Sequence, residues 1–85
     1  MRPEKLRGRI ARGAVKNVDF DDLIRLLQAL DFKEVGGRGS HRVFVRSGVA
    51  EILTLQEVHG QAKPYQVRQI AALIHQYNLD LEAES

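Results

Sequence analysis

A glycine-rich basic turn that contains a histidine is the part of the sequence best suited to chemistry. It spans residues 36–44 and reads Gly-Gly-Arg-Gly-Ser-His-Arg-Val-Phe. Arg38 and Arg42 place fixed positive charge on either side of His41, and the usual histidine pKa, roughly 6.5, allows proton exchange near neutral pH. Glycine leaves room for another molecule to approach the backbone closely. This combination is suited to a phosphodiester ligand.

A second loop, residues 57–63, carries similar residue types. It contains His59, Gly60 and Lys63, and Pro64 then opens a helix, whose N-terminus favours anions. If the two loops meet at one end of a sheet, they form one basic patch from five side chains, Arg38, His41, Arg42, His59 and Lys63. The alternative is a cluster of solvated loop residues without a ligand.

Composition and spacing argue against several other kinds of site. The chain has no cysteine, so disulfides and thiolate metal ligands are absent. Its three histidines are far apart, with no carboxylate at short ligand spacing, and we expect no metal and no cofactor. No apolar run approaches the roughly 18 residues of a membrane span, and the N-terminus lacks the apolar segment of a signal peptide. We therefore expect a soluble, cytoplasmic protein.

Charge is distributed unevenly along the chain. Residues 1–16 hold six basic side chains and one acidic one, whereas the rest of the chain holds seven basic and ten acidic ones. We expect residues 1–16 to form a flexible basic arm, residues 17–79 the folded domain, and residues 80–85 a frayed acidic end. Such an arm attracts polyanions in a salt-dependent way, and the alternative is a solvated tail.

The periodicity of apolar residues predicts two helices that flank three strands. The first helix is predicted to begin after Asp19 as its N-cap and to end near Asp31, which tolerates a left-handed backbone. The second runs from Pro64 towards Asn78 as a C-cap. Strands are predicted at residues 32–35, 41–46 and 50–56. We therefore predict an α+β two-layer sandwich, with both helices on one face of a three-stranded antiparallel sheet.

Alternation along the second strand assigns its side chains to two faces. His41, Val43 and Val45 share one face, and the other carries two arginines and an aromatic residue, Arg42, Phe44 and Arg46. Two valines against two arginines predict that the valine face points inward. His41 would then lie at the rim of a buried face, unless a bulge among the glycines turns it away.

From Asp22 to Tyr77, the sequence resembles the HicA toxin family of bacterial toxin–antitoxin systems. The resemblance lies in the order and spacing of short motifs, which are Leu23-Ile24-Arg25-Leu26-Leu27, Phe32, Gly39-Ser40-His41-Arg42-Val43-Phe44, Val58-His59-Gly60 and Lys63-Pro64-Tyr65-Gln66-Val67-Arg68-Gln69-Ile70. It implies a double-stranded-RNA-binding-domain-like α-β-β-β-α fold, and metal-free cleavage of mRNA with His41 as the catalytic histidine. It also implies a HicB-like antitoxin as protein partner.

RNA supplies its own nucleophile, the 2′-hydroxyl, so a histidine that moves protons near the phosphate could contribute about 10²–10⁴-fold to its cleavage. His59 is the candidate for a second proton-transfer group. The candidate RNA contacts are Arg38, Ser40, Arg42 and Lys63. Two alternatives stay open: a non-catalytic RNA-binding module, and an inactive toxin remnant that acts through a protein partner. The sequence also leaves homo-oligomerisation open.

Overall fold

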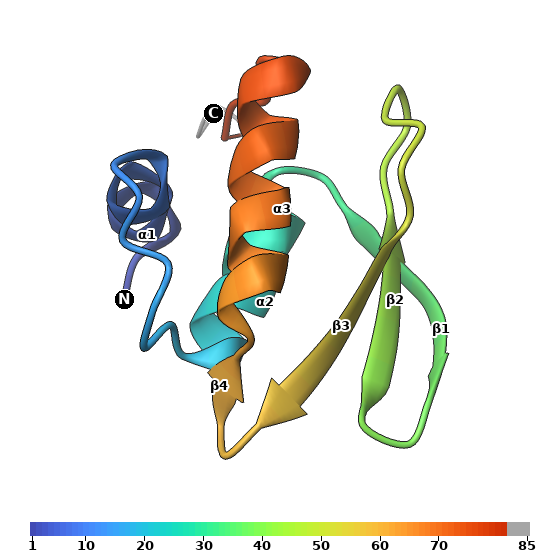
Figure 1. The fold of residues 1–85 in the computed structure, drawn as a ribbon. Helices are drawn as coiled ribbons and strands as arrows, with labels where there is room; N and C mark the ends of the chain where they lie inside the picture. The colour runs from blue at the N-terminus through green and yellow to red at the C-terminus, as the bar shows by residue number, and fades with distance from the viewer. Residues whose placement is uncertain (82–85) are drawn as a thin grey trace.

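The computed structural model describes residues 1–81. Over these residues the chain forms α1 (Pro3–Ala11), α2 (Phe20–Ala29), β1 (Lys33–Arg38), β2 (His41–Val45), β3 (Leu53–Val58), β4 (Gln61–Ala62) and α3 (Pro64–Gln76). The strands form one antiparallel sheet in the order β1-β2-β3-β4. Figure 1 shows α2 and α3 beside the sheet and α1 beyond them, on the side away from β1 and β2. The α+β antiparallel prediction is confirmed, but the sheet has a fourth strand and the fold a third helix.

Helix α1 replaces the flexible arm that we expected at the N-terminus. Pro3 occupies its first turn, and Leu6 and Ile10, one turn apart, are only 1% and 2% exposed. Fully burying two such side chains stabilises the fold by about 1.5–3 kcal/mol each. Arg7 fastens the same helix to the C-terminal segment, because its Nη2 donates a hydrogen bond to the carbonyl of Leu79 at 2.8 Å. The expectation of little fixed structure here was wrong, because it gave these two apolar residues too little weight.

Both ends of α2 lie where the sequence predicts them. The side chain of Asp19 accepts a hydrogen bond from the backbone N–H of Asp22 at 3.0 Å, as an N-cap does. At the other end Asp31 takes a left-handed backbone, with φ of 69°, and the N–H of Phe32 donates to the carbonyl of Leu27 at 2.9 Å. These features form a Schellman motif with aspartate in place of the usual glycine. They turn the chain into β1.

β1 and β3 both end later in the chain than predicted. β1 continues through Gly36 and Gly37 to Arg38 rather than ending at the glycines, with a bulge between Glu34 and Gly36. β3 is displaced towards the C-terminus relative to the predicted strand, and β4 pairs with its last residues.

One edge of the sheet is covered by another segment of the chain, and the other edge is exposed. The segment around Asp19 covers the short β4: the N–H of Phe20 donates to the carbonyl of Gly60, and the N–H of Ala62 to that of Val18, both at 2.9 Å. β1 is exposed along its whole length and forms the other edge.

A buried glutamine holds α3 against the part of β3 that β4 does not reach. Gln66 is 4% exposed, and its Nε2 donates to the carbonyl of Thr54 at 2.9 Å. Its Oε1 accepts from the backbone N–H of Gln56 at 3.2 Å. The side-chain amide therefore takes the place of a neighbouring strand along this stretch of β3.

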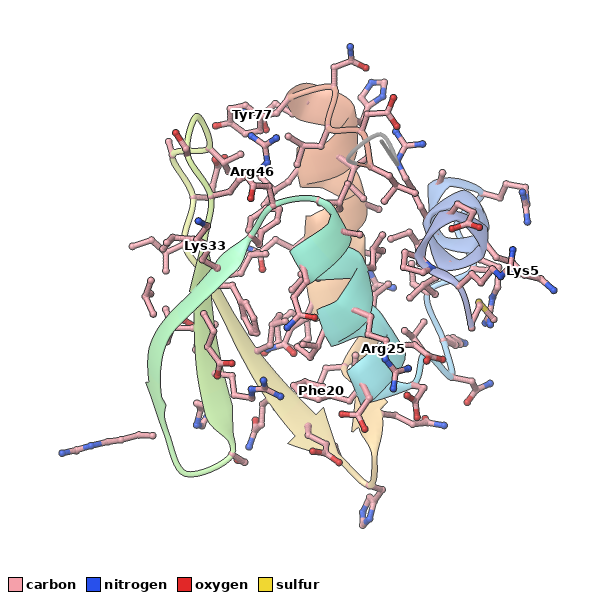
Figure 2. The ribbon with its side chains drawn as sticks, turned by 180° about the vertical axis from the view of Figure 1, so that it is seen from behind. Lys5, Phe20, Arg25, Lys33, Arg46 and Tyr77 are labelled. Atoms are coloured by element: carbon pink, nitrogen blue, oxygen red, sulfur yellow. The ribbon has the colours of Figure 1, made fainter. Side chains whose placement is uncertain are left out.

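The C-terminal end of α3 contacts the loop between β2 and β3. There Tyr77 donates a hydrogen bond from its hydroxyl to Glu51 in the β2–β3 loop at 2.6 Å, and Figure 2 shows the ring between the end of α3 and that loop. No helix among residues 1–81 is long and apolar enough to cross a membrane. Residues 82–85 of the acidic end that we expected to be frayed lie outside the described part of the chain.

Candidate active site

The β1–β2 hairpin places His41 directly after a tight turn. Gly39 and Ser40 form this two-residue turn, and Arg38 pairs with His41 across it. Gly39 has a φ of 58°, and the first position of such a turn favours glycine when φ is positive. His41 therefore begins β2 on backbone that is paired on both sides, with Arg38 and with Gln56, rather than in an unpaired loop.

Gly37 lets the two strands of this hairpin approach closely. A Cβ atom at Gly37 would lie 2.2 Å from the carbonyl oxygen of His41, and its φ of 148° lies in a region that disfavours side chains. A Cβ atom at Gly36 or Gly39 would meet nothing within 4 Å. Gly36 also has no positive φ, so the fold itself does not require glycine there.

A shallow hollow of about 330 Å³ lies over this hairpin. Three of its seven lining residues are glycines, so backbone forms much of its floor. The other four lining residues are one carboxylate, two arginines and one histidine, namely Glu34, Arg38, Arg42 and His41. The hollow therefore offers an exposed imidazole and positive charge beside an accessible backbone.

The face of β2 that points into the protein is opposite to the predicted one. Phe44 is fully buried, and the alternation of the strand places Arg42 and Arg46 on the same inward face. His41, Val43 and Val45 lie on the open face, and His41 is exposed. The valine-inward expectation was wrong because Phe44 buries more apolar surface than either valine, while arginines can bury their stems and keep their charged ends paired.

Arg42 is paired with another side chain of the protein, although it remains about a third exposed. Its Nε and Nη2 donate to the two carboxylate oxygens of Glu34 at 2.9 and 2.7 Å, a bidentate pair. Its guanidinium also lies 5.8 Å from the ring centroid of Phe20 and 5.7 Å from that of Phe44. The hydrogen bonding between the two side chains lowers the pKa of the Glu34 carboxyl and raises the pKa of the Arg42 guanidinium. The pair neutralises one side of the hollow.

Arg46 has a comparable internal role at the other end of β2. Its Nε donates to the carbonyl of Leu30 at 2.6 Å, and Figure 2 shows its side chain directed towards the end of α2. A cation at a helix C-terminus is favourable for the helix dipole.

The side chains of Arg38 and Ser40, at the turn, are accessible to a ligand. Both are exposed, and within residues 1–81 no ion pair or hydrogen bond engages the side chain of Arg38. The Oγ of Ser40 accepts a hydrogen bond from Nε2 of Gln56 at 3.3 Å, which links the turn to β3. The described part of the chain likewise shows no hydrogen bond to the imidazole of His41.

The two predicted loops lie at the same end of the sheet but remain separate (Figure 1). His59 and Gly60 connect β3 to β4 with φ values of 52° and 78°, the pattern of a type I′ turn. His41 pairs with Gln56, three residues before His59, which corresponds to about 10 Å along a strand. The exposed His59 therefore has a clear backbone role in this turn.

Lys63 lies at the start of α3, as predicted. It is the N-cap residue of the helix and is half-buried. Its Nζ lies 6.0 Å from the ring centroid of Tyr65, which is 57% exposed. The ammonium thus sits at a helix N-terminus next to an exposed aromatic ring.

Two residues that support the site, Glu34 and Gln66, were not predicted from the sequence. Glu34 neutralises Arg42, and an acidic residue across a hairpin from an arginine is the pattern that could have indicated it. Gln66 braces β3 opposite His41, and the only signal was a polar residue beside the apolar stripe of α3.

Comparison with known proteins identifies the family. Among residues 1–81, no three His, Asp or Glu side chains gather as metal ligands. No curated protein and no solved structure matches the chain significantly. The sequence profile described as "HicA toxin of bacterial toxin-antitoxin" matches residues 20–79, from the first residue of α2 to just beyond α3. Because this match covers well over half of the sequence, the chain belongs to the HicA toxin family of bacterial toxin–antitoxin systems.

Proposed function

We propose that this toxin is a ribonuclease that cleaves mRNA without a metal ion, with His41 as a general acid or base. The observation that carries the proposal is the position of His41: an exposed imidazole beside a glycine-floored hollow, next to Arg38, which has no ion-pair partner within residues 1–81. The proposal takes the toxin to be cytoplasmic, where mRNA is found. Its protein partner is a HicB-like antitoxin, as membership in a toxin–antitoxin family implies.

The reaction follows from the chemistry of RNA. The 2′-oxygen attacks the adjacent phosphorus while a base removes its proton, and the bond from phosphorus to the 5′-oxygen of the next nucleotide breaks. An acid gives a proton to that 5′-oxygen. The products are a 2′,3′-cyclic phosphate and a 5′-hydroxyl. Because DNA lacks the 2′-hydroxyl, this reaction is confined to RNA.

His41 supplies one of these two proton transfers in our proposal. Its place on paired backbone at the start of β2 supports this role, since a proton-transfer group must be held at hydrogen-bond distance from the reacting oxygen. His59 is the proposed second group. Because it belongs to the neighbouring turn, bound RNA would have to span both turns for His59 to act.

Arg38, Ser40 and Lys63 are the proposed contacts to the RNA backbone. Charge builds on the phosphoryl oxygens during the reaction, and a nearby cation stabilises it. Arg38 is the best placed, because it lines the hollow and no carboxylate of residues 1–81 pairs with it. Arg42, a fourth proposed contact, can reach a phosphate only in competition with Glu34.

The test is a cleavage assay in EDTA with the purified protein and its His41→Ala variant. We expect cleavage of a single-stranded RNA, no cleavage of the matching DNA, and loss of RNA cleavage in the variant. The side chain of His41 is exposed, so the variant should keep its fold, which circular dichroism checks. Persistent cleavage by the variant would reject His41 as the centre.

A second candidate function is a non-catalytic RNA-binding module. The excess of basic residues on and around α1 favours it, because a positive surface binds nucleic acid without chemistry. RNA binding by the folded wild-type protein with no turnover would support this function and count against the first.

A further inference from the structure

Helix α1 carries a row of basic side chains on its outer side. Lys5 and Arg9 lie within the helix, and Arg2 and Arg12 are its N-cap and C-cap residues; the intervals of three, four and three residues place the four along one side of α1. Leu6 and Ile10 occupy the neighbouring face and are buried against the rest of the protein. We call these four residues the basic row. Figure 2 shows Lys5 directed away from the body of the protein.

The charges of the basic row are largely uncompensated. Within residues 1–81, the one ion pair that involves the row joins Arg2 to Glu4 at 3.9 Å, and both side chains are mostly exposed, so this pair contributes little. Arg9 donates a long hydrogen bond of 3.5 Å to the carbonyl of Lys16, which leaves its charge in place. Lys5 and Arg12 are exposed.

We propose that the basic row binds the phosphate backbone of RNA, as a second contact surface separate from the hollow at His41. The inference rests on the proposed function for the identity of the nucleic acid. Ten residues of helical spacing separate the first and last cations, about 15 Å at 1.5 Å per residue, so the row can follow several successive phosphates. Arginine and lysine are the usual partners of phosphate oxygens.

The surroundings of the row favour a nucleic acid over an acidic protein. Protein interfaces have an apolar centre of large side chains. Among the described residues, the one exposed large apolar side chain close to α1 in sequence is Met1, at 44% exposure. A surface with four cations and almost no apolar anchor is typical of backbone binding that ignores sequence.

The position of α1 makes this surface distinct from the cleavage site. α2 and α3 lie between α1 and the strands β1 and β2, and the protein measures 34 × 25 × 24 Å. An RNA that contacts both surfaces must therefore pass around a large part of the protein. A few nucleotides suffice to fill the hollow, whereas only a longer RNA reaches the basic row as well.

The experiment measures RNA affinity in a His41→Ala background, where the RNA stays intact. Fluorescence anisotropy gives the Kd for an RNA of about 30 nucleotides and one of about 4, in each case over a range of salt concentrations. The variant is Lys5→Gln, Arg9→Gln, Arg12→Gln, because glutamine keeps the helix propensity and removes the charge. The control is Arg68→Gln, which removes one exposed cation from α3.

We expect the triple variant to bind the long RNA about tenfold more weakly near physiological salt, with the slope of log K against log salt reduced by about 2 for three lost contacts. The short RNA and the Arg68→Gln control should be unaffected. If the triple variant binds the long RNA with the same Kd as the protein that carries only His41→Ala, the proposal is overturned. An equal loss for both RNAs would also overturn it, because the row would then not be a separate surface.

Three further outcomes have a defined consequence. If the triple variant does not fold, the single Lys5→Gln variant decides, with an expected loss of about twofold for the long RNA only; no change would reject the proposal. Binding of poly-glutamate in preference to RNA would reject it in favour of an acidic protein partner. A failure of cleavage by the wild-type protein would reject the proposed function alone, since this assay requires no turnover.

Discussion

Replacing Gln66 with leucine should destabilise the protein and disturb the strand next to His41. Leucine has a similar size, so the change removes two hydrogen bonds without leaving a large cavity. The bonds lost are those from Nε2 to the carbonyl of Thr54, at 2.9 Å, and from the N–H of Gln56 to Oε1, at 3.2 Å. Both backbone groups lie along the stretch of β3 that β4 does not cover.

The magnitude follows from these two bonds. Each contributes about 0.5–1.5 kcal/mol net, and a backbone group left without a partner in a buried place costs about 1–3 kcal/mol. Because both bonds are only part-buried, water can reach the freed groups to some extent. We therefore expect a loss of about 2 kcal/mol, or about 8–16 °C in Tm for a domain of this size.

Urea denaturation and a thermal melt measure the effect. The matched control is Gln69→Leu, an exposed glutamine on the same helix, for which we expect a change within about 0.5 kcal/mol. A third variant, Gln66→Glu, places a carboxylate oxygen against the carbonyl of Thr54. A protonated glutamate can donate there, so the destabilisation in this variant should be full above the raised pKa of the new carboxyl and should shrink as the pH falls. Equal stability of Gln66→Leu and Gln69→Leu would refute the role of the amide.

Three further predictions concern the hairpin. Gly37→Ala should destabilise the protein by about 2 kcal/mol or more, because the new methyl group meets the carbonyl of His41, whereas Gly36→Ala should cost less than about 0.5 kcal/mol; urea denaturation compares them. Glu34→Gln should raise RNA affinity, measured by anisotropy, because it frees the charge of Arg42; an unchanged Kd would count against that release. The pKa of Glu34 is lowered in the folded state, so its stabilising contribution is present above its unfolded pKa and lost as the pH falls through the folded value. The wild-type protein should therefore lose more stability than Glu34→Gln on acidification, and parallel losses would contradict this.

The predictable parts of the fold were those set by local chemistry. Asp19 begins α2 and Asp31 ends it because one side chain caps free N–H groups and the other tolerates a left-handed backbone. The start of α3 at Pro64 follows from the same kind of local rule. Such signals need no knowledge of the rest of the chain.

The wrong predictions depended on tertiary contacts. A helix as short as α1 is marginal in isolation, so it forms because Leu6 and Ile10 find a surface on α2 and α3. The inward face of β2 is decided by Phe44, and the arginines beside it are accommodated by Glu34 and by the end of α2. Neither partner is visible from alternation along the strand alone.

The candidate site was predicted in part. The histidine and the glycine turn were recognisable as a local motif, and the structure places both loops at one end of the sheet. The structure also assigns Arg42 an internal partner and His59 a backbone role, and these depend on cross-strand pairing and turn geometry.

The chemical nature of the ends that the protein leaves on RNA shows whether the 2′-hydroxyl is the nucleophile and His41 the proton-transfer group. An RNA with a known cleavage position is treated in EDTA with the wild-type protein and with His41→Ala, beside a copy that lacks the single 2′-hydroxyl at that position. We predict a 2′,3′-cyclic phosphate and a 5′-hydroxyl from the wild-type protein, and no cleavage in either of the other two reactions. Cleavage of the 2′-deoxy copy, or undiminished cleavage by His41→Ala, would contradict the proposal.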